Sequence, residues 1–254
     1  MEKIAASMVA PDSAPAGNRT SRSLVYGLTL LRQFTAEQPV RGIAELAEIL
    51  NVSRPTAHRY ASTCLELGYL EQAPMRRYRL ARRAAEPGLA LLGSLPLVRR
   101  AQPVLRELRR RSGRTASLAT LDGADVLYLQ RLCGFAPGQY ELDRGLGAGT
   151  RRPARHTAAG EALLARSGEH THRPRRIRDD GLVVVDGGLR ADARGLAVAI
   201  QTPGERTYAI EATVPAHAMS VGDATGELGD ALRAAAAVLQ RRPAAPRATQ
   251  RVAS

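Results

Sequence analysis

The segment "LAEILNVSRPTAHRY", Leu46 to Tyr60, decides how the N-terminal part of this chain folds. Its first residues form an apolar stripe at helical spacing, and the turn 51–53 follows. Ser53 is a good N-cap and Pro55 is tolerated in a first helical turn, so a second helix is predicted to begin here. Asn51 stands where the backbone must turn left-handed, which asparagine tolerates better than most residues. The segment therefore predicts two helices joined by a tight corner.

The sequence on either side of this corner completes a larger unit. Upstream, residues 23–34 carry leucines at helical spacing and predict a further helix. Downstream, "YLEQAP" (69–74) and "RRYRLA" (76–81) are typical of two short strands joined in a hairpin. Three helices followed by a hairpin form a winged helix-turn-helix, whose third helix enters the major groove of DNA.

The third helix is predicted to run from Ser53 to Gly68, with two different faces. Ala57, Ala61, Cys64 and Leu67 can pack against the other helices, which turns the polar residues outward. Guanidinium and hydroxyl groups in this position can bind base edges and phosphates. The candidate DNA-binding residues are Ser53, Arg54, Thr56, His58, Arg59 and Thr63 on this helix, and Arg76 and Arg77 at the tip of the hairpin. The alternative is a winged helix that binds protein and leaves these arginines in solvent.

The second half of the chain has a different pattern. A helix is predicted over 97–111, with an apolar stripe and an arginine-rich remainder. Two strands follow within 115–132, turned at 122–124, and then a helix over 156–166. Three further strands and a last helix are predicted within 181–188, 195–202, 207–216 and 224–240. We therefore expect an α/β module with a largely antiparallel sheet, and an α+β fold for the whole chain.

Composition limits the class of protein. The chain has 254 residues, of which 44% are apolar, enough for two modest domains. It contains no apolar run of the roughly 20 residues that a membrane span needs, and its N-terminus lacks the apolar stretch of a secretory signal, so we expect a cytoplasmic protein without a membrane partner. The net charge of +13 favours a nucleic-acid partner. However, nearly all the basic residues are arginines spread over both halves, so charge alone does not locate the DNA-binding part.

Few residues suggest catalysis or metal binding. Cys64 and Cys133 lie within apolar patterns and are expected to be two buried thiols. His170 and His172 lie two residues apart without a third ligand at a plausible spacing, which favours a polar loop over a metal site. The sequence contains no nucleophile elbow, phosphate-binding loop or zinc spacing. We therefore expect no enzyme, no metal and no cofactor.

Several segments together resemble one known family. They include "GIAELAEILNVSRPTAHRYASTCLELGYLEQ", "AQPVLRELRRRSGRTASLATLDGADVLYLQRL", "RHTAAGEALLA" and "RGLAVAI". In order and spacing they resemble the isocitrate lyase regulator (IclR) family of bacterial transcription factors. The chain departs from the family pattern at two places. The segment 166–180 is short and arginine-rich, and the wing tip "APMRR" lacks the usual Asp-Gly turn.

The resemblance implies a domain organisation and a function. It implies a winged helix-turn-helix over 21–83, a linker helix over 84–111 and a C-terminal effector-binding domain over 112–240, related to the GAF and PAS folds. Residues 1–20 and 241–254 are expected to be disordered tails, because they are rich in small and polar residues without periodicity. The implied function is a ligand-responsive transcriptional regulator that binds a pseudo-palindromic double-stranded DNA operator as a homodimer or tetramer, as repressor or activator.

By the same resemblance, the effector cavity lies over one face of the sheet. The candidate effector-binding residues are Tyr128, Arg131, His156, Ala197, Ala199, Glu211 and Thr213. Arg131 at a strand end and His156 at a helix start could anchor a carboxylate or an aromatic acid, although each could also be an ordinary surface, capping or packing residue. If Glu211 points inward, an unpaired anion there is costly and disfavours a carboxylate effector. If it points outward, it carries no information about the ligand.

One alternative function stays open at this point. The arginine content and the short segment 166–180 would also suit an architectural DNA-binding protein with a degenerate effector domain. Such a protein would coat DNA uniformly, whereas a regulator protects a discrete site.

Overall fold

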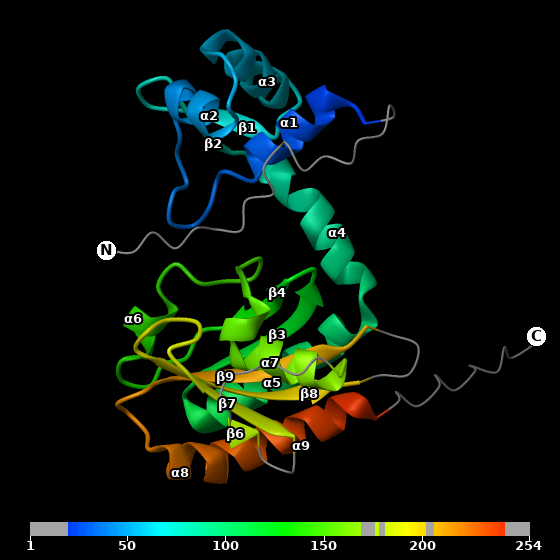
Figure 1. Cartoon of the computed structure of the whole chain (residues 1–254), viewed down its shortest axis with the longest axis vertical. Coiled ribbons are helices and arrows are strands. Elements are labelled where there is room, and N and C mark those ends of the chain that lie inside the picture. Colours follow the sequence, from blue (N-terminus) through cyan, green and yellow to red (C-terminus); the bar gives the residue numbers. More distant parts are fainter. Residues whose placement is uncertain (1–19, 169–175, 178–180, 202–205, 242–254) are drawn as a thin grey trace, which may run out of the picture. The chain divides into compact units, whose positions relative to one another are not determined.

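The computed structural model describes residues 20–168, 176–177, 181–201 and 206–241 (Figure 1). These residues divide into two compact units, one ending at Leu95 and the other beginning at Pro96. Nearly all of both expected tails, and most of the segment 166–180, lie outside the described residues. Among the described helices, none is long and apolar enough to cross a lipid bilayer.

The first unit begins with three helices and a two-stranded antiparallel sheet, in the order that the sequence predicts. Its core is formed by buried side chains from all of these elements, among them Leu30, Leu46, Leu50, Ala61 and Tyr78. The elements are α1 (Arg22–Leu31), α2 (Ile43–Ile49), α3 (Arg54–Glu66), β1 (Leu70–Ala73) and β2 (Arg77–Leu80), followed by a 3-10 turn (Arg82–Ala85) and α4 (Glu86–Ser94).

The corner between α2 and α3 has the predicted geometry. Asn51 is left-handed, with a φ of 51°. Ser53 is extended and its Oγ accepts a hydrogen bond from the Thr56 backbone N–H at 3.4 Å, while Pro55 lies in the first turn of α3. These observations confirm the N-cap and the left-handed asparagine that the sequence indicated.

One residue of the predicted packing face of α3 is exposed instead of buried. Ala57, Ala61 and Cys64 are buried as expected, but Leu67 is 54% exposed. A helix turns about 100° per residue, so around the helix axis the side chain of Leu67 points roughly 80° away from that of Ala57. The prediction that Leu67 packs inward was therefore wrong.

The region expected to be one linker helix is interrupted. α4 ends at Ser94, Leu95 is extended, and α5 (Pro96–Ser112) begins a new helix in the second unit. The ring of Pro96 disfavours helical backbone at the residue before it, which explains the break. α5 packs its stripe of buried residues against the sheet and against the last helix, so this helix is part of the core of the second unit.

The second unit is built on a seven-stranded sheet in which every neighbouring pair is antiparallel. The strand order is β5-β4-β3-β9-β8-β7-β6. The strands are β3 (Thr115–Asp122), β4 (Asp125–Leu132), β5 (Arg151–Pro153), β6 (Arg176–Ile177), β7 (Leu182–Asp186), β8 (Ala193–Ile200) and β9 (Tyr208–Pro215). The fold is α+β with a largely antiparallel C-terminal sheet, as predicted.

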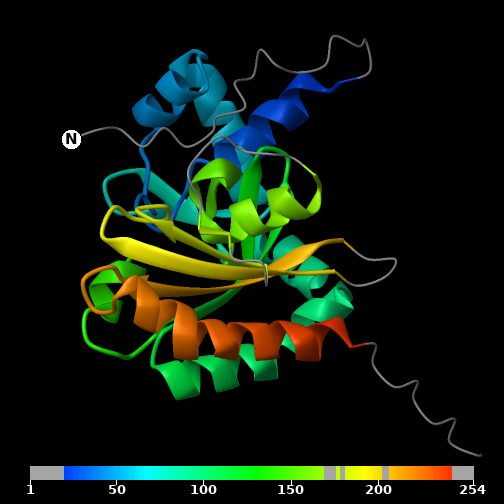
Figure 2. The same ribbon diagram turned by 60° about the horizontal axis from the view of Figure 1, so that its bottom comes forward.

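Helices cover both faces of this sheet (Figure 2). α5 and α9 (Gly229–Gln240) lie side by side on one face, and α7 (Ala158–Arg166) lies on the other. The shorter elements are α6 (Gln139–Asp143), a 3-10 turn (Ala154–His156), α8 (Val221–Asp223) and a π-turn (Ala224–Leu228) that leads into α9.

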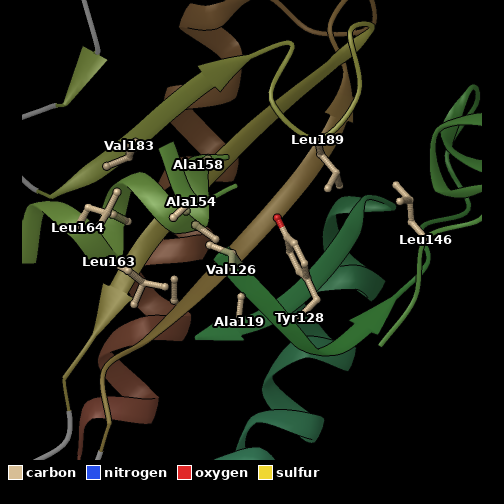
Figure 3. Packing of buried hydrophobic residues seen from close by; sticks show 14 residues of the cluster. Ala119, Val126, Tyr128, Leu146, Ala154, Ala158, Leu163, Leu164, Val183 and Leu189 are labelled. Atoms are coloured by element: carbon tan, nitrogen blue, oxygen red, sulfur yellow. The ribbon is translucent and has the colours of Figure 1, made fainter. Parts of the chain in front are cut away.

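The space between the sheet and α7 is a tightly packed apolar core (Figure 3). Ala119, Val126 and Ala197 from the strands meet Ala159 and Leu163 from the helix. Small side chains dominate, so helix and sheet approach closely. The 3-10 turn before α7 packs equally closely on the helix, because a Cβ on Gly160 would lie 2.2 Å from the carbonyl oxygen of Ala154. This core positions the polar residues described below.

The two cysteines have different surroundings. Cys64 is buried in the first unit, as expected. Cys133 is exposed, because β4 ends at Leu132 and Cys133 follows it in the connecting loop. The prediction that Cys133 is a core residue was therefore wrong.

Candidate functional site

The outer face of α3 presents the first set of candidate residues. Arg54, His58, Arg59 and Thr63 are exposed, as the sequence predicts. Among the described residues, the Arg54 guanidinium has no hydrogen-bond or ion-pair partner. Ser53 and Thr56 bind each other through their hydroxyls at 2.9 Å, so both serve the helix cap.

Arg59 is supported by two aromatic rings. Its guanidinium carbon lies 5.7 Å from the centre of the Tyr60 ring, and that ring stacks on Tyr26 at 5.4 Å. Such a cation–π contact limits the motion of the guanidinium while leaving its N–H groups exposed. The Thr63 hydroxyl donates to the Arg59 carbonyl at 3.0 Å, which uses its proton within the helix. The guanidinium of Arg59 is therefore held in place with N–H groups free to donate two parallel hydrogen bonds to one partner.

The two arginines of the wing tip are not equivalent. Arg76 is exposed and lies in the turn, where both Met75 and Arg76 have positive φ, at 58° and 55°. Arg77 is half-buried, and its Nη2 donates to the Val40 carbonyl at 3.1 Å and to Glu45 Oε1 at 2.9 Å. Arg77 thus ties the hairpin to the loop before α2 and to α2 itself, whereas the sequence placed it free at the tip.

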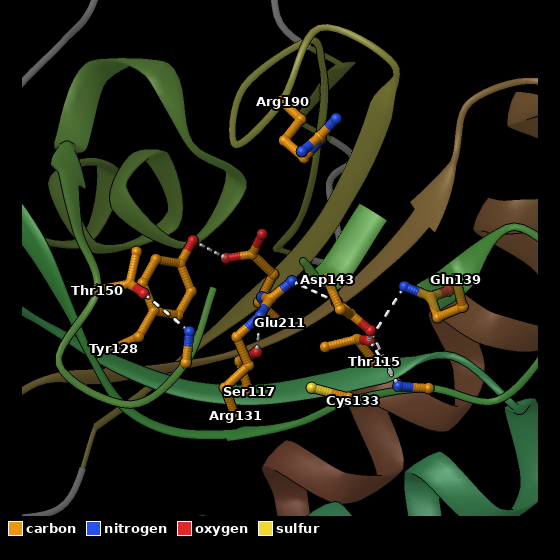
Figure 4. A network of polar contacts seen from close by, with 12 residues as sticks. Thr115, Ser117, Tyr128, Arg131, Cys133, Gln139, Asp143, Thr150, Arg190 and Glu211 are labelled. Carbon is orange, nitrogen blue, oxygen red and sulfur yellow. Dashed lines mark hydrogen bonds and ion pairs between the residues drawn. The ribbon is translucent and has the colours of Figure 1, made fainter. Parts of the chain in front are cut away.

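Three of the second set of candidate residues, Tyr128, Arg131 and Glu211, lie together on the face of the sheet that α7 covers (Figure 4). Ser117 in β3 lies opposite Arg131 in β4 and opposite Glu211 in β9. Tyr128 is three residues before Arg131, so regular alternation would place it on the other face. A register shift between Leu118 and Ala119 pairs Tyr128 with Ala119 and brings it to the same face. The structure therefore brings Tyr128, Arg131 and Glu211 together.

Arg131 takes part in a buried network through both of its terminal nitrogens. Its Nη2 lies 2.7 Å from Asp143 Oδ1, and its Nη1 lies 3.2 Å from Ser117 Oγ. The Arg131 and Asp143 side chains are only 1% and 4% exposed. The Thr115 hydroxyl and the Gly134 N–H also donate to Asp143 Oδ2. Arg131 is therefore not a surface residue, and its charge is balanced within the protein.

Sequence reasoning missed two members of this network, Asp143 and Gln139. Both lie in α6, which has only five residues and therefore no helical periodicity to detect. Gln139 is buried, and its amide donates to Thr115 Oγ1 at 3.0 Å. An acidic residue in "QYELDRG" carries no signal that it pairs with an arginine in the neighbouring strand.

Glu211 points inward. Its side chain is buried, and the Tyr128 hydroxyl donates to Oε2 at 2.7 Å. Burial raises the pKa of Glu211, against the hydrogen bond from Tyr128 and the charge of Arg131, which lower it. Burial also raises the pKa of Tyr128 well above its usual value, with the nearby Glu211 charge acting in the same direction, so the phenol stays protonated and remains a donor.

The remaining candidates differ in their surroundings. Thr213 and Ala197 are buried and Ala199 is half-buried, all on β8 or β9 near Glu211. His156 is exposed and is the last residue of the 3-10 turn, while Thr157 is the N-cap of α7. The prediction that His156 begins the helix was therefore wrong by two residues.

No group of three or more His, Cys, Asp or Glu side chains that could hold a metal ion occurs within the described residues. His170 and His172 lie outside them.

The raised pKa of Glu211 predicts a specific pH dependence. The folded protein favours the protonated carboxyl, so its contribution to stability is full below the ordinary pKa near 4.5 and is lost as pH rises through the raised value. Glu211→Gln keeps an acceptor for the Tyr128 hydroxyl, and its amide does not ionise in this pH range. Melting curves between pH 4 and pH 8 should therefore show the variant gaining on the wild type as pH rises. Parallel curves would contradict this assignment.

The chain matches known proteins in both of its units. Residues 23–74 match the IclR helix-turn-helix domain, and residues 89–174 match the bacterial transcriptional regulator IclR C-terminal domain. The chain is 31% identical to the HTH-type transcriptional regulator XynR of Escherichia coli over 58% of each chain, so this match spans less than two thirds of that relative. It is 28% identical to the HTH-type transcriptional regulator TsaQ1/TsaQ2 of Comamonas testosteroni, over 85% of this chain and 86% of that one. These relatives are named as transcriptional regulators, not as enzymes.

A solved structure shows the same fold. It is an IclR homologue from Microbacterium hydrocarbonoxydans in complex with 4-hydroxybenzoate, with a TM-score of 0.68. The alignment covers 86% of this chain and 97% of that one at 23% identity.

Proposed function

Since the chain belongs to the IclR family of transcriptional regulators, we propose that it binds a pseudo-palindromic DNA operator as a homo-oligomer and responds to a small molecule in its C-terminal unit. The observation that carries this proposal is the presence of two separate sites on one chain. One is the exposed face of α3 with Arg54 and Arg59, and the other is the buried polar network around Arg131 and Glu211.

The face of α3 supports the DNA-binding half of the proposal. Its exposed groups are guanidinium, imidazole and hydroxyl groups, which suit base edges and phosphates. A single such helix reads only a few base pairs, so selectivity within a genome needs two half-sites and therefore at least a dimer. The exposed leucines Leu24 and Leu28 on α1, and Leu89 and Leu91 on α4, are apolar surface that a second copy could cover.

The buried network supports the ligand-binding half. Ligand sites combine an apolar lining with a few precisely placed polar groups. Here the apolar core between the sheet and α7 adjoins the buried polar side chains of Arg131, Tyr128 and Glu211. To regulate, the ligand must bind one arrangement of the oligomer better than another, because equal affinity shifts no equilibrium.

A thermal-shift screen of the full chain tests the ligand-binding half. A ligand at 100 times its Kd adds about 2.7 kcal/mol to the free energy of unfolding. Aromatic compounds come first, since the similar Microbacterium protein is complexed with 4-hydroxybenzoate. Stabilisation by one chemical class supports a sensor, and a screen without any hit favours the architectural alternative.

The wing yields a prediction for the salt dependence of DNA binding. Because Arg77 is held by Val40 and Glu45, we assign the phosphate contact to Arg76. Arg76→Ala should make the slope of log affinity against log salt shallower by about one unit for each bound copy. Arg77→Ala, as the matched control, should leave the slope unchanged and lower the melting temperature. Anisotropy titrations at several salt concentrations measure both, and the reverse pattern would return the contact to Arg77.

A further inference from the structure

Glu211 occupies a central place in the candidate ligand site. It lies in the middle of β9, between Ser117 of β3 and Ala197 of β8, and it is 1% exposed. Its carboxyl group points toward the Tyr128 hydroxyl (Figure 4). Burying an ionisable side chain costs free energy, because burial disfavours its charged form. The position of Glu211 therefore calls for an explanation.

The two carboxyl oxygens of Glu211 have different surroundings. Oε2 accepts the hydrogen bond from Tyr128, and the carboxyl also interacts with the Ala159 backbone N–H and the Thr213 hydroxyl, which both lower its pKa. Oε1 lies against β8 and the start of α7, since a Cβ on Gly195 would be 2.9 Å from it and 3.0 Å from the Ala158 Cβ. The N-terminus of a helix favours negative charge. The Glu211 carboxyl therefore lies where a ligand carboxylate would find a phenol donor, a nearby guanidinium and a helix N-terminus.

Within the described part of the chain, the two arginines drawn at this site are already paired with acids (Figure 4). Arg131 is paired with Asp143 at 2.7 Å. Arg190, on the loop between β7 and β8, is exposed and lies 3.3 Å from Asp192. A ligand carboxylate entering beside Glu211 would meet a like charge in a poorly solvated site, and like charges a few ångströms apart do not both ionise readily.

The donors beside Glu211 are already used by its own carboxyl. Tyr128, the Ala159 backbone N–H and Thr213 all interact with it. Two buried atoms of the neighbouring network have no partner within the described part of the chain, the Gln139 carbonyl oxygen, which accepts, and Arg131 Nε, which donates. A second carboxylate beside Glu211 would therefore compete for donors that are already occupied, whereas an uncharged or cationic ligand does not need them.

We infer that Glu211 supplies, from the protein itself, the carboxyl group that an acidic ligand would otherwise bring, so that this site selects an uncharged or cationic ligand over an acid. The inference rests on the proposed function, since it names the ligand class of the same site. It also narrows the choice left by the sequence, in which a carboxylate or aromatic acid was a candidate effector.

Chemical rescue tests the assignment of Glu211 without knowledge of the effector. Glu211→Ala removes the atoms of an acetate ion, and the full-length variant is melted at pH 7 in 100 mM sodium acetate, in acetamide and in sodium chloride. Acetate should raise the melting temperature of this variant by on the order of 3 °C and leave the wild type unchanged. Glu227→Ala, the same change at an exposed position, is the control. Equal effects of acetate on all three proteins would overturn the assignment.

A folding failure of Glu211→Ala does not remove the test. If the variant is insoluble in buffer alone, recovery of folded protein in acetate but not in acetamide supports the assignment, and equal recovery in both overturns it.

The ligand class is tested on the wild type with two probes that differ in one group, 4-hydroxybenzoate and 4-hydroxybenzamide. The amide should stabilise the protein more than the acid, and greater stabilisation by the acid would overturn the inference. If acetate rescues Glu211→Ala but no compound in a broad screen stabilises the wild type, the proposed sensing function fails while the assignment of Glu211 stands.

Discussion

Asp143→Asn is expected to lower the free energy of unfolding of the second unit by about 3 to 5 kcal/mol. The substitution removes the charge that balances Arg131, whose side chain is 1% exposed, and leaves a buried guanidinium without a counterion. It also changes the acceptor for Thr115 and for the Gly134 N–H. Urea denaturation followed by circular dichroism measures the loss.

A second ion pair of the same length provides the control. Arg110 and Glu107 on α5 also lie 2.7 Å apart, but both are exposed. Solvent screens such a pair, so Glu107→Gln should cost much less than Asp143→Asn. Replacing both buried partners, as in Arg131→Met with Asp143→Leu, should recover much of the loss from Asp143→Asn, because no unpaired charge remains. Equal losses of unfolding free energy in Asp143→Asn and Glu107→Gln would show that solvent reaches the Arg131–Asp143 pair.

Arg59→Ala is expected to weaken binding to a specific operator far more than binding to random DNA. A bidentate contact of an arginine with guanine contributes about 1 to 3 kcal/mol of discrimination, and both half-sites lose it in a dimer. The stack of Tyr26 on Tyr60 beneath the guanidinium favours this role, because it holds the group in place before DNA arrives.

The comparison needs a selected operator and a scrambled duplex of the same length, both titrated by fluorescence anisotropy at one salt concentration. Arg76→Ala is the matched control and should weaken both complexes by similar factors, as a phosphate contact does. Equal losses for Arg59→Ala on the two duplexes would reassign Arg59 to the phosphate backbone.

Local sequence patterns were enough to predict the helices and the hairpin of the first unit. The corner needs only an N-cap at Ser53, a proline in the next turn and a residue that tolerates a left-handed backbone at Asn51, and each of these is visible within a few residues. In the second unit, short apolar runs between turn residues predicted the strands β3, β4, β7, β8 and β9, but not the short strands β5 and β6. Where a prediction rested on extending a pattern past its end, as for Leu67 and Cys133, it was wrong.

The candidate ligand site depends on contacts that local patterns do not contain. Tyr128 shares a face with Arg131 only because of the irregular pairing between β3 and β4. Asp143 reaches Arg131 from a helix of five residues after a loop. The orientation of Glu211 was left open by the sequence, since a strand with apolar residues on both sides gives no periodicity to choose a face. The structure resolves it as inward and hydrogen-bonded to Tyr128.

Footprinting of the full chain on duplexes selected from random DNA separates a regulator of discrete genes from an architectural protein. For a regulator with a defined operator we expect a single protected segment with two inversely related halves, spaced by about one helical turn or a multiple of it, and unprotected flanks at saturating protein. Uniform protection along the whole duplex, without an enriched sequence, would contradict the proposed regulator and support an architectural DNA-binding protein.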